Sequence, residues 1–150
     1  MRARRPSPDW AAIGALRQVQ MIAAELGMRD GELGVSRAAD EHRQSLDQLN
    51  LAQSGWQAHL EGTAIDPGVL GAWQRDITVT AANASEKKAN LDTASETLDI
   101  LRHAWLDARR HHDLARERDR AARLTAARTR DERTLGAAAD MTAQRWGAGE

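Results

Sequence analysis

The feature that most constrains the fold is a long run without glycine or proline in the second half of the chain. Between Gly71 and Gly136 lie 64 residues that contain neither type, so nothing in this run interrupts a helix. Alternate steps of three and four residues, starting at Leu70, meet eighteen positions, of which thirteen are apolar. This spacing is typical of a coiled coil, and we call these positions the seam of the helix. The seam comprises Leu70, Trp73, Ile77, Thr80, Ala84, Lys87, Leu91, Ala94, Leu98, Leu101, Trp105, Ala108, His112, Ala115, Asp119, Ala122, Ala126 and Thr129.

Prolines mark the expected helix starts. Ser7-Pro8-Asp9 reads as a cap, a first helical residue and a first-turn acid, and Asp66-Pro67 repeats the cap and the proline. Gly62 can end the first helix in the left-handed conformation. The sequence therefore predicts a helix at about 8–61, a turn at about 62–66 and a helix at about 67–145, as one unit over residues 1–150.

The first helix has two apolar seams that are out of register with each other. One comprises Leu46, Leu49, Gln53, Trp56 and Leu60, and the other Ala12, Leu16, Val19, Ala23, Leu26 and Leu33. They meet near Gly27, Gly31 and Gly34, where a helix could bend or break, because glycine weakens a helix interior. The alternative is then a three-helix arrangement in the style of a spectrin repeat.

We favour two helices, because a compact three-helix bundle would leave much of the long second helix unpaired. The predicted fold is all-α, an elongated antiparallel two-helix coiled-coil hairpin with a longer second helix. It places Leu60 opposite Leu70, Trp56 opposite Trp73, and Leu49 opposite the region from Ile77 to Ala84. About 25 residues at the end of the second helix then lack a partner. Apolar residues that drift off the seam there predict a partner-binding element: Leu114, Ala121, Leu124, Leu135 and Ala138.

The composition argues against an enzyme. Alanine supplies 29 of the 150 residues, and Phe, Tyr and Cys do not occur, so a thin helical protein offers no enclosed pocket for catalysis. No phosphate-binding loop, dinucleotide fingerprint or HExxH motif occurs. We interpret the histidines, His42, His59, His103, His111 and His112, as surface residues. We expect no enzymatic activity, no cofactor and no metal site.

Charge and hydropathy suggest where the protein works. No apolar run approaches the ~20 residues that span a bilayer, and the N-terminal stretch lacks the apolar segment of a signal peptide. We therefore expect a cytoplasmic protein that does not insert directly into a membrane. Residues 102–150 carry 11 basic and 8 acidic side chains. Because no aromatic residues interleave with these arginines, we expect no nucleic-acid partner; a nucleic-acid-associated helical protein is the less favoured reading.

Several local motifs resemble those of one family. They are Trp56-Gln-Ala-His-Leu60 before the turn, Trp73 early in the second helix, Ala104-Trp105 followed by a charged stretch, and an Arg-rich run from Arg128 to Arg133. Together they resemble the FliJ/YscO family, the central stalk proteins of flagellar and injectisome type III secretion. The resemblance covers about residues 10–140.

The resemblance implies an antiparallel coiled coil without chemistry of its own, which would link a hexameric export ATPase to the cytoplasmic domain of the export gate. Export chaperones are a further implied partner. The residues implied for gate contact are Trp56, Trp73, Ile77, Thr80 and Ala84, for which plain coiled-coil packing is the other interpretation. Those implied for the ATPase pore are Arg116, Arg120, Arg123, Arg128, Arg130 and Arg133. A generic coiled-coil adaptor or oligomerising rod is the alternative function.

Overall fold

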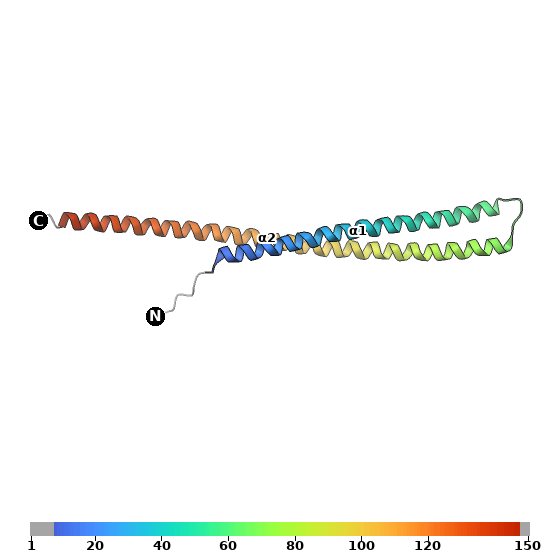
Figure 1. Ribbon diagram of the computed structural model, residues 1–150, viewed down its shortest axis with the longest axis horizontal. Coiled ribbons are helices and arrows are strands. Elements are labelled where there is room, and N and C mark those ends of the chain that lie inside the picture. The colour runs from blue at the N-terminus through green and yellow to red at the C-terminus, as the bar shows by residue number, and fades with distance from the viewer. Residues whose placement is uncertain (1–7, 148–150) are drawn as a thin grey trace. The chain divides into compact units, whose positions relative to one another are not determined.

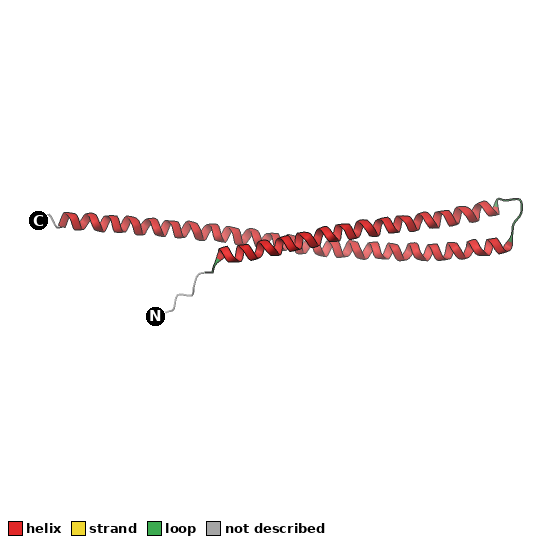
Figure 2. Cartoon of the chain, in the orientation of Figure 1, coloured by secondary structure: helices red, strands yellow, loops and turns green. Residues whose placement is uncertain are grey.

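Two long helices make up the computed structural model, which describes residues 8–147. They are α1 (Trp10–Leu60) and α2 (Pro67–Gly147), and 94% of the described chain is helical (Figure 2). No strand occurs in this part of the chain. The prediction of an all-α two-helix hairpin with a longer second helix is confirmed.

The chain divides into two units, which we describe separately. The hairpin unit comprises Ala23–Trp105; here α1 and α2 run side by side in opposite directions and are joined by the turn (Figure 1). The terminal unit comprises Met1–Ile22 and Leu106–Glu150, and so holds the start of α1 and the second part of α2.

Each helix begins at an aspartate that caps it. Asp9 Oδ1 accepts hydrogen bonds from the backbone N–H groups of Ala11 and Ala12, both at 3.1 Å. Pro8 therefore precedes α1, and the prediction that Pro8 starts the helix and Asp9 lies in its first turn is wrong, because the Asp9 carboxylate satisfies the free N–H groups itself. Ser7, the predicted cap, lies outside the described residues.

The turn between the helices is closed by a histidine side chain. Asp66 caps α2 as predicted, accepting the N–H of Gly68 at 2.8 Å, and Pro67 is the first helical residue. No described glycine has a positive φ, so the prediction of a left-handed Gly62 is wrong. The Gly62 N–H instead donates to the carbonyl of His59 at 3.3 Å, and His59 Nε2 accepts the N–H of Asp66 at 3.2 Å.

The predicted seam of α2 is confirmed as far as Asp119. Every seam residue from Leu70 to Trp105 in the hairpin unit, and from Ala108 to Asp119 in the terminal unit, is buried or half-buried. The most buried apolar members are Ala84, Leu98 and Ala115. Beyond Asp119 the predicted Ala122 and Ala126 are exposed.

The two predicted seams of α1 are wrong. Leu16, Val19, Leu26, Leu33, Leu46 and Leu60 are all exposed, by 40% to 65%; Ala12, Ala23, Gln53 and Trp56 are exposed too, and of the predicted residues only Leu49 is half-buried. Most of the buried and half-buried residues keep one regular spacing of three and four residues instead. The residues with this spacing are Trp10, Gly14, Arg17 and Met21 in the terminal unit, and Ala24, Met28, Gly31, Val35, Ala38, His42, Ser45, Leu49 and Ala52 in the hairpin unit. Other half-buried residues of α1 lie outside this spacing, namely Ile13, Glu25, Gly27, Gly34, Ala39, Gly55 and His59.

Complementary side-chain sizes explain this seam. A methyl group on Gly31 would lie 2.9 Å from Leu101 Cδ1 and 3.2 Å from Leu98 Cδ1, and one on Gly27 would lie 3.7 Å from Leu101 Cδ2. The large residues of α2 thus occupy space that small residues of α1 leave. The glycines expected to bend or break the helix are the places where α2 packs closely, and α1 is continuous through residues 27–34.

Polar contacts between the helices of the hairpin unit fix their register. Lys87 Nζ lies 2.8 Å from Glu41 Oε2, and Arg102 Nη2 lies 3.7 Å from Glu32 Oε1. The hydrogen bond and charge of Lys87 lower the pKa of Glu41, and Glu41 in turn raises the pKa of Lys87. These two pairs place residues 32–41 of α1 beside residues 87–102 of α2.

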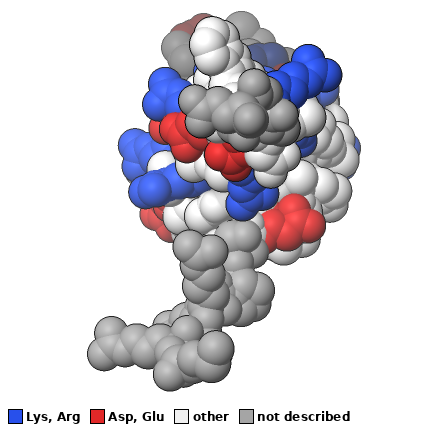
Figure 3. Space-filling view, turned by 90° about the vertical axis from the view of Figure 1, so that its left-hand side faces the viewer, with Lys and Arg blue, Asp and Glu red and all other residues white. Residues whose placement is uncertain are grey.

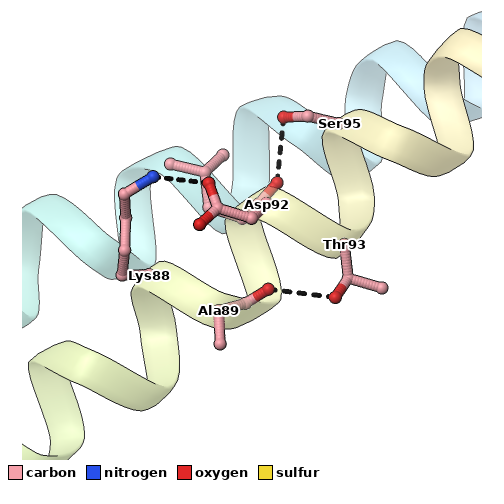
Figure 4. Close-up of polar contacts among 6 residues, drawn as sticks. Lys88, Ala89, Asp92, Thr93 and Ser95 are labelled. Atoms are coloured by element: carbon pink, nitrogen blue, oxygen red, sulfur yellow. Dashed lines mark hydrogen bonds and ion pairs between the residues drawn. The ribbon is translucent and has the colours of Figure 1, made fainter.

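Other polar side chains bond within their own helix. In α2, Lys88 pairs with Asp92, while the Thr93 and Ser95 hydroxyls donate to the carbonyls of Ala89 and Leu91 (Figure 4). Such bonds satisfy hydroxyl groups without joining the two helices.

Candidate partner-binding surfaces

The residues expected to contact an export gate lie mainly on the seam of α2. Trp73, Ile77 and Thr80 are half-buried, and Ala84 is buried at 5% exposure. Seam positions follow one another along α2 at three- and four-residue spacing, so these four residues share one face of the helix. That face is the one that packs on α1.

Trp73 fits into the hairpin because the residue opposite it on α1, Gly55, has no side chain. A methyl group on Gly55 would lie 2.5 Å from Trp73 Cη2 and 2.8 Å from Cζ2. The indole ring therefore lies directly over the backbone of α1 at Gly55. Trp56, the predicted partner of Trp73, is one residue further along and is 39% exposed.

Thr80 is tied to its own helix. Its hydroxyl donates to the carbonyl of Asp76 at 2.9 Å and also lies 3.2 Å from the carbonyl of Ile77. Together with the burial of Ala84, these bonds give Ile77, Thr80 and Ala84 a packing role in the folded hairpin. Trp56 is the exposed member of the predicted gate set.

A shallow groove lets part of this set reach the surface of the hairpin unit. The groove has a volume of about 330 Å³, and it is lined by Gln48, Leu51, Ala52, Trp73, Asp76 and Thr80. Leu51 is 72% exposed. Trp73 and Thr80 are thus accessible along one edge, in a groove that α1 and α2 form together.

The arginines expected at the ATPase pore lie on α2 in the terminal unit, and all six are exposed. Helical spacing groups four of them: Arg120 follows Arg116 by four residues, Arg123 follows Arg120 by three, and Arg130 follows Arg123 by seven. We call these four residues the arginine face. Arg128 lies about 160° around the helix from Arg130, since two residues advance about 200°, and Arg133 lies at the margin of the face.

Most of this positive charge is not neutralised by neighbouring acids. Arg123 Nη2 lies 2.8 Å from Asp119 Oδ2. The other five predicted arginines form no ion pair with any described acidic residue. Acidic side chains lie among them along the chain, at Glu117, Asp119, Asp131 and Glu132. The face drawn in Figure 3 likewise shows blue basic and red acidic side chains side by side.

A groove within the terminal unit lies beside the arginine face. It has a volume of about 440 Å³ and is lined by Trp10, Ala11, Gly14 and Gln18 of α1 and by His112, Arg116, Asp119 and Arg123 of α2.

His112 is buried in this groove, with Nδ1 3.3 Å from Asp113 Oδ1. The interpretation of His112 as a surface residue is wrong, because it lies on the seam where α1 covers it. His42 and His59 are half-buried as well, while His103 and His111 are exposed.

Within residues 8–147, no group of three or more His, Asp or Glu side chains could hold a metal ion. No helix in the same part of the chain is long and apolar enough to cross a membrane.

Sequence reasoning missed the exposed apolar residues around the turn, which are Leu60, Ile65 and Val69. A signal for this surface exists in the sequence. No Lys or Arg occurs from Gln44 to Gln74, a stretch that contains Asp47, Glu61 and Asp66. The end of the hairpin is therefore acidic as well as apolar.

Comparison of the chain with protein-family models, with curated proteins and with solved structures found no match.

Proposed function

We propose that this protein is a non-enzymatic central stalk of a type III secretion export apparatus, of the flagellar or injectisome type. It links the hexameric export ATPase to the export gate at the cytoplasmic face of the apparatus, and it also meets export chaperones. Two things support the proposal: the local motifs that resemble the FliJ/YscO family, and the form of α2 in the terminal unit.

The observation that carries the proposal is that α2 continues beyond its pairing with α1. The continuous buried part of the seam ends at Asp119, and from Arg120 to Trp146 every residue except Thr129 is exposed. A single α-helix with its side chains is about 10–12 Å across. A helix of that width, carrying the arginine face, suits insertion into a channel lined by another protein.

Electrostatics supports an acidic lining for that channel. Arg120 and Arg130 of the arginine face have no described acidic partner, so their guanidinium groups can form bidentate contacts with carboxylates. The stalk makes and breaks no covalent bond in this scheme. It transmits motion, and the close packing of Leu98 and Leu101 on Gly31 gives the hairpin unit the fixed register that transmission requires.

The direct test is binding to a purified hexameric secretion ATPase from the same organism. The full chain is compared with a chain truncated after Arg123, which keeps the seam and the Asp119–Arg123 pair. We expect the full chain to bind and the truncated chain to bind at least about tenfold more weakly. Failure of both chains to bind would overturn the stalk proposal.

One observation favours a second candidate, a coiled-coil adaptor or oligomerising rod. Large apolar side chains of α1 face away from α2: Leu16, Val19 and Ile22 in the terminal unit, and Leu26 and Leu33 in the hairpin unit. Exposed apolar surface of this kind can pair with another helix. A stable homo-oligomer in light scattering at micromolar concentration, dissociated by Val19→Glu, would favour this candidate, whereas a monomer agrees with the stalk.

A further inference from the structure

The second part of α2 carries a row of exposed residues whose order is symmetric. Steps of three, four, three, four and three residues connect them, and all are exposed, Leu124 by 57% and Leu135 by 70%. Read from either end, the order is alanine, leucine, a charged residue, a charged residue, leucine and alanine. We call these six residues the tail seam: Ala121, Leu124, Arg128, Asp131, Leu135 and Ala138.

The tail seam lies on one face of α2, the face opposite α1. The helix is continuous from Pro67 to Gly147, and each residue advances about 100° around its axis, so the six residues fall within a sector of about 100°. Ala115, which is buried on the other seam of α2 at 3% exposure, lies about 180° from Leu124 around the axis. A second helix can therefore pack on the tail seam without displacing α1 in the terminal unit.

The two charges at the centre of the tail seam specify what packs there. Neither Arg128 nor Asp131 forms an ion pair with another residue in the described part of the chain. Parallel pairing of two copies would place each of these residues opposite its own like charge. Antiparallel pairing, about a two-fold axis between residues 128 and 131, places Arg128 of each copy opposite Asp131 of the other.

The same two-fold axis matches the apolar residues by size. It brings Leu124 of one copy opposite Leu135 of the other, and Ala121 opposite Ala138, because the spacing is identical in both directions. Small alanines at the two ends allow the helices to approach closely there. A helix of another protein would not require this symmetry, so the symmetry points to a second copy of the chain.

We infer that the tail seam pairs two copies of this protein in an antiparallel dimer, with Arg128 and Asp131 forming two ion pairs across the two-fold axis. Only two leucines per chain contribute large apolar side chains, and alanine buries little area. We therefore expect a weak dimer, with a dissociation constant on the order of 100 μM.

On the proposed function, this pairing and entry into the ATPase exclude each other. One helix is about 10–12 Å across, whereas two packed helices have axes about 8–10 Å apart and are together about 20 Å across. The tail seam is thus paired only in the free protein, and α2 enters a channel as a single helix. At low micromolar concentration the chain is monomeric, as the stalk requires.

The test follows self-association of the full chain by sedimentation equilibrium from about 5 to about 500 μM. Arg128→Asp and Asp131→Arg each place like charges opposite each other twice in the dimer, so each should weaken association at least about tenfold. Arg128→Asp/Asp131→Arg restores opposite charges and should associate within about threefold of the wild type. An equimolar mixture of the two single variants should also pair, because one supplies two carboxylates and the other two guanidinium groups.

Two further variants complete the test. Arg133→Asp is the matched control, because it changes the net charge as Arg128→Asp does and lies about 180° from Leu124 around the exposed helix; its association should equal that of the wild type. Leu124→Glu should abolish the dimer by placing a charge among the apolar residues of the tail seam. Helicity by circular dichroism should stay the same in every variant, since all the changed residues are exposed.

Weaker association of both single variants, with recovery in the double variant and in the mixture, supports the antiparallel dimer. A wild-type chain that stays monomeric over the whole range overturns it, as does a dimer that the single charge reversals do not weaken. Failure of the double variant to recover overturns the pairing of Arg128 with Asp131. A dimer dissociated by Val19→Glu but not by Leu124→Glu pairs through α1 and overturns the inference as well. The stalk proposal is decided separately, by ATPase binding.

Discussion

The indole ring of Trp73 lies over the backbone of Gly55, so close that a methyl group at Gly55 would lie 2.5 Å from Cη2 of the ring. The same relationship recurs where Leu98 and Leu101 meet Gly31. At these positions of the hairpin unit a bulky side chain of α2 thus packs against a glycine of α1. The stability of the hairpin should depend on small side chains at particular positions of α1.

The first prediction contrasts two glycines of α1. Gly55→Ala should lower the free energy of unfolding by about 1 kcal/mol or more, because overpacking costs ~1–3 kcal/mol and exceeds the gain in helix propensity. Gly34→Ala should raise the free energy of unfolding by roughly 0.5–1 kcal/mol, since nothing lies within 4 Å of the added methyl group. Urea unfolding followed by circular dichroism measures both. Equal effects of the two substitutions would contradict the close approach of Trp73.

The second prediction contrasts two leucines of the hairpin unit. Leu98 is 6% exposed on the seam of α2, whereas Leu33 is 54% exposed on α1. Leu98→Ala should lower the free energy of unfolding by about 2–3 kcal/mol through lost burial and a residual cavity, and Leu33→Ala by less than ~1 kcal/mol. Urea unfolding measures both changes. If Leu33→Ala lowered the free energy of unfolding more than Leu98→Ala does, this result would contradict the observed packing and favour the seam that the hydrophobic pattern suggested for α1.

The third prediction concerns the Glu41–Lys87 pair and pH. The pKa of Glu41 is lowered, so its contribution to stability is present above its unfolded pKa of about 4.5 and is lost as the pH falls through the folded pKa. The pKa of Lys87 is raised, so its contribution is present below about 10.5 and is lost as the pH rises through the folded pKa. The pair should therefore stabilise the hairpin between about pH 5 and pH 10.

This pH dependence is measured by comparing melting temperatures of the wild type and a Glu41→Gln/Lys87→Gln variant. The difference should be largest near neutral pH and should shrink toward pH 3 and pH 11. Arg43→Gln/Asp40→Asn, which removes an exposed pair within α1, is the control. A constant difference across the whole pH range would show that the Glu41–Lys87 pair contributes nothing by its charge.

The fourth prediction concerns the turn. His59→Ala removes the acceptor of the Asp66 N–H, which lies 3.2 Å from Nε2, and should lower the free energy of unfolding by roughly 1 kcal/mol. His111→Ala, at an exposed position of α2, should change it by less than ~0.5 kcal/mol. Amide hydrogen exchange at Asp66 gives a local readout, which should become faster in the His59 variant and stay the same in the His111 variant.

The two helices differ in how far their sequences reveal the packing. The seam of α2 could be predicted because its members include large apolar residues such as Trp73, Leu98 and Trp105. The seam of α1 mixes Gly, Ala, Ser and His with a few large apolar residues such as Met28, Val35 and Leu49, while many of the large apolar residues of α1, such as Leu16, Leu26 and Leu33, are exposed. Hydrophobic periodicity therefore points to the wrong face of α1. The fit of Leu98 and Leu101 against Gly31 and of Trp73 against Gly55 reveals which face is paired.

The candidate surfaces also differ in how far the sequence reveals them. The exposure of the arginines could be predicted from the sequence, because charged side chains on a helix without a packing partner stay in contact with solvent. For the apolar residues around the turn, the sequence shows the acidic surroundings but not the exposure, since the exposure of Leu60 and Val69 depends on where the turn places them. The role of His59 in the turn was likewise hidden, because its contact with Asp66 joins residues on either side of a backbone reversal.

The central claim, that α2 enters an ATPase through its arginine face, is tested most directly by the dissociation constant of the full chain for the purified hexameric secretion ATPase. Arg120→Glu/Arg130→Glu reverses two charges on the face, and Arg118→Glu/Arg128→Glu reverses two elsewhere around the same helix, with an identical change in net charge. We predict that the first variant binds at least about tenfold more weakly than the wild type and that the second binds within about threefold of it. Equal weakening by both variants, or by neither, would contradict the claim.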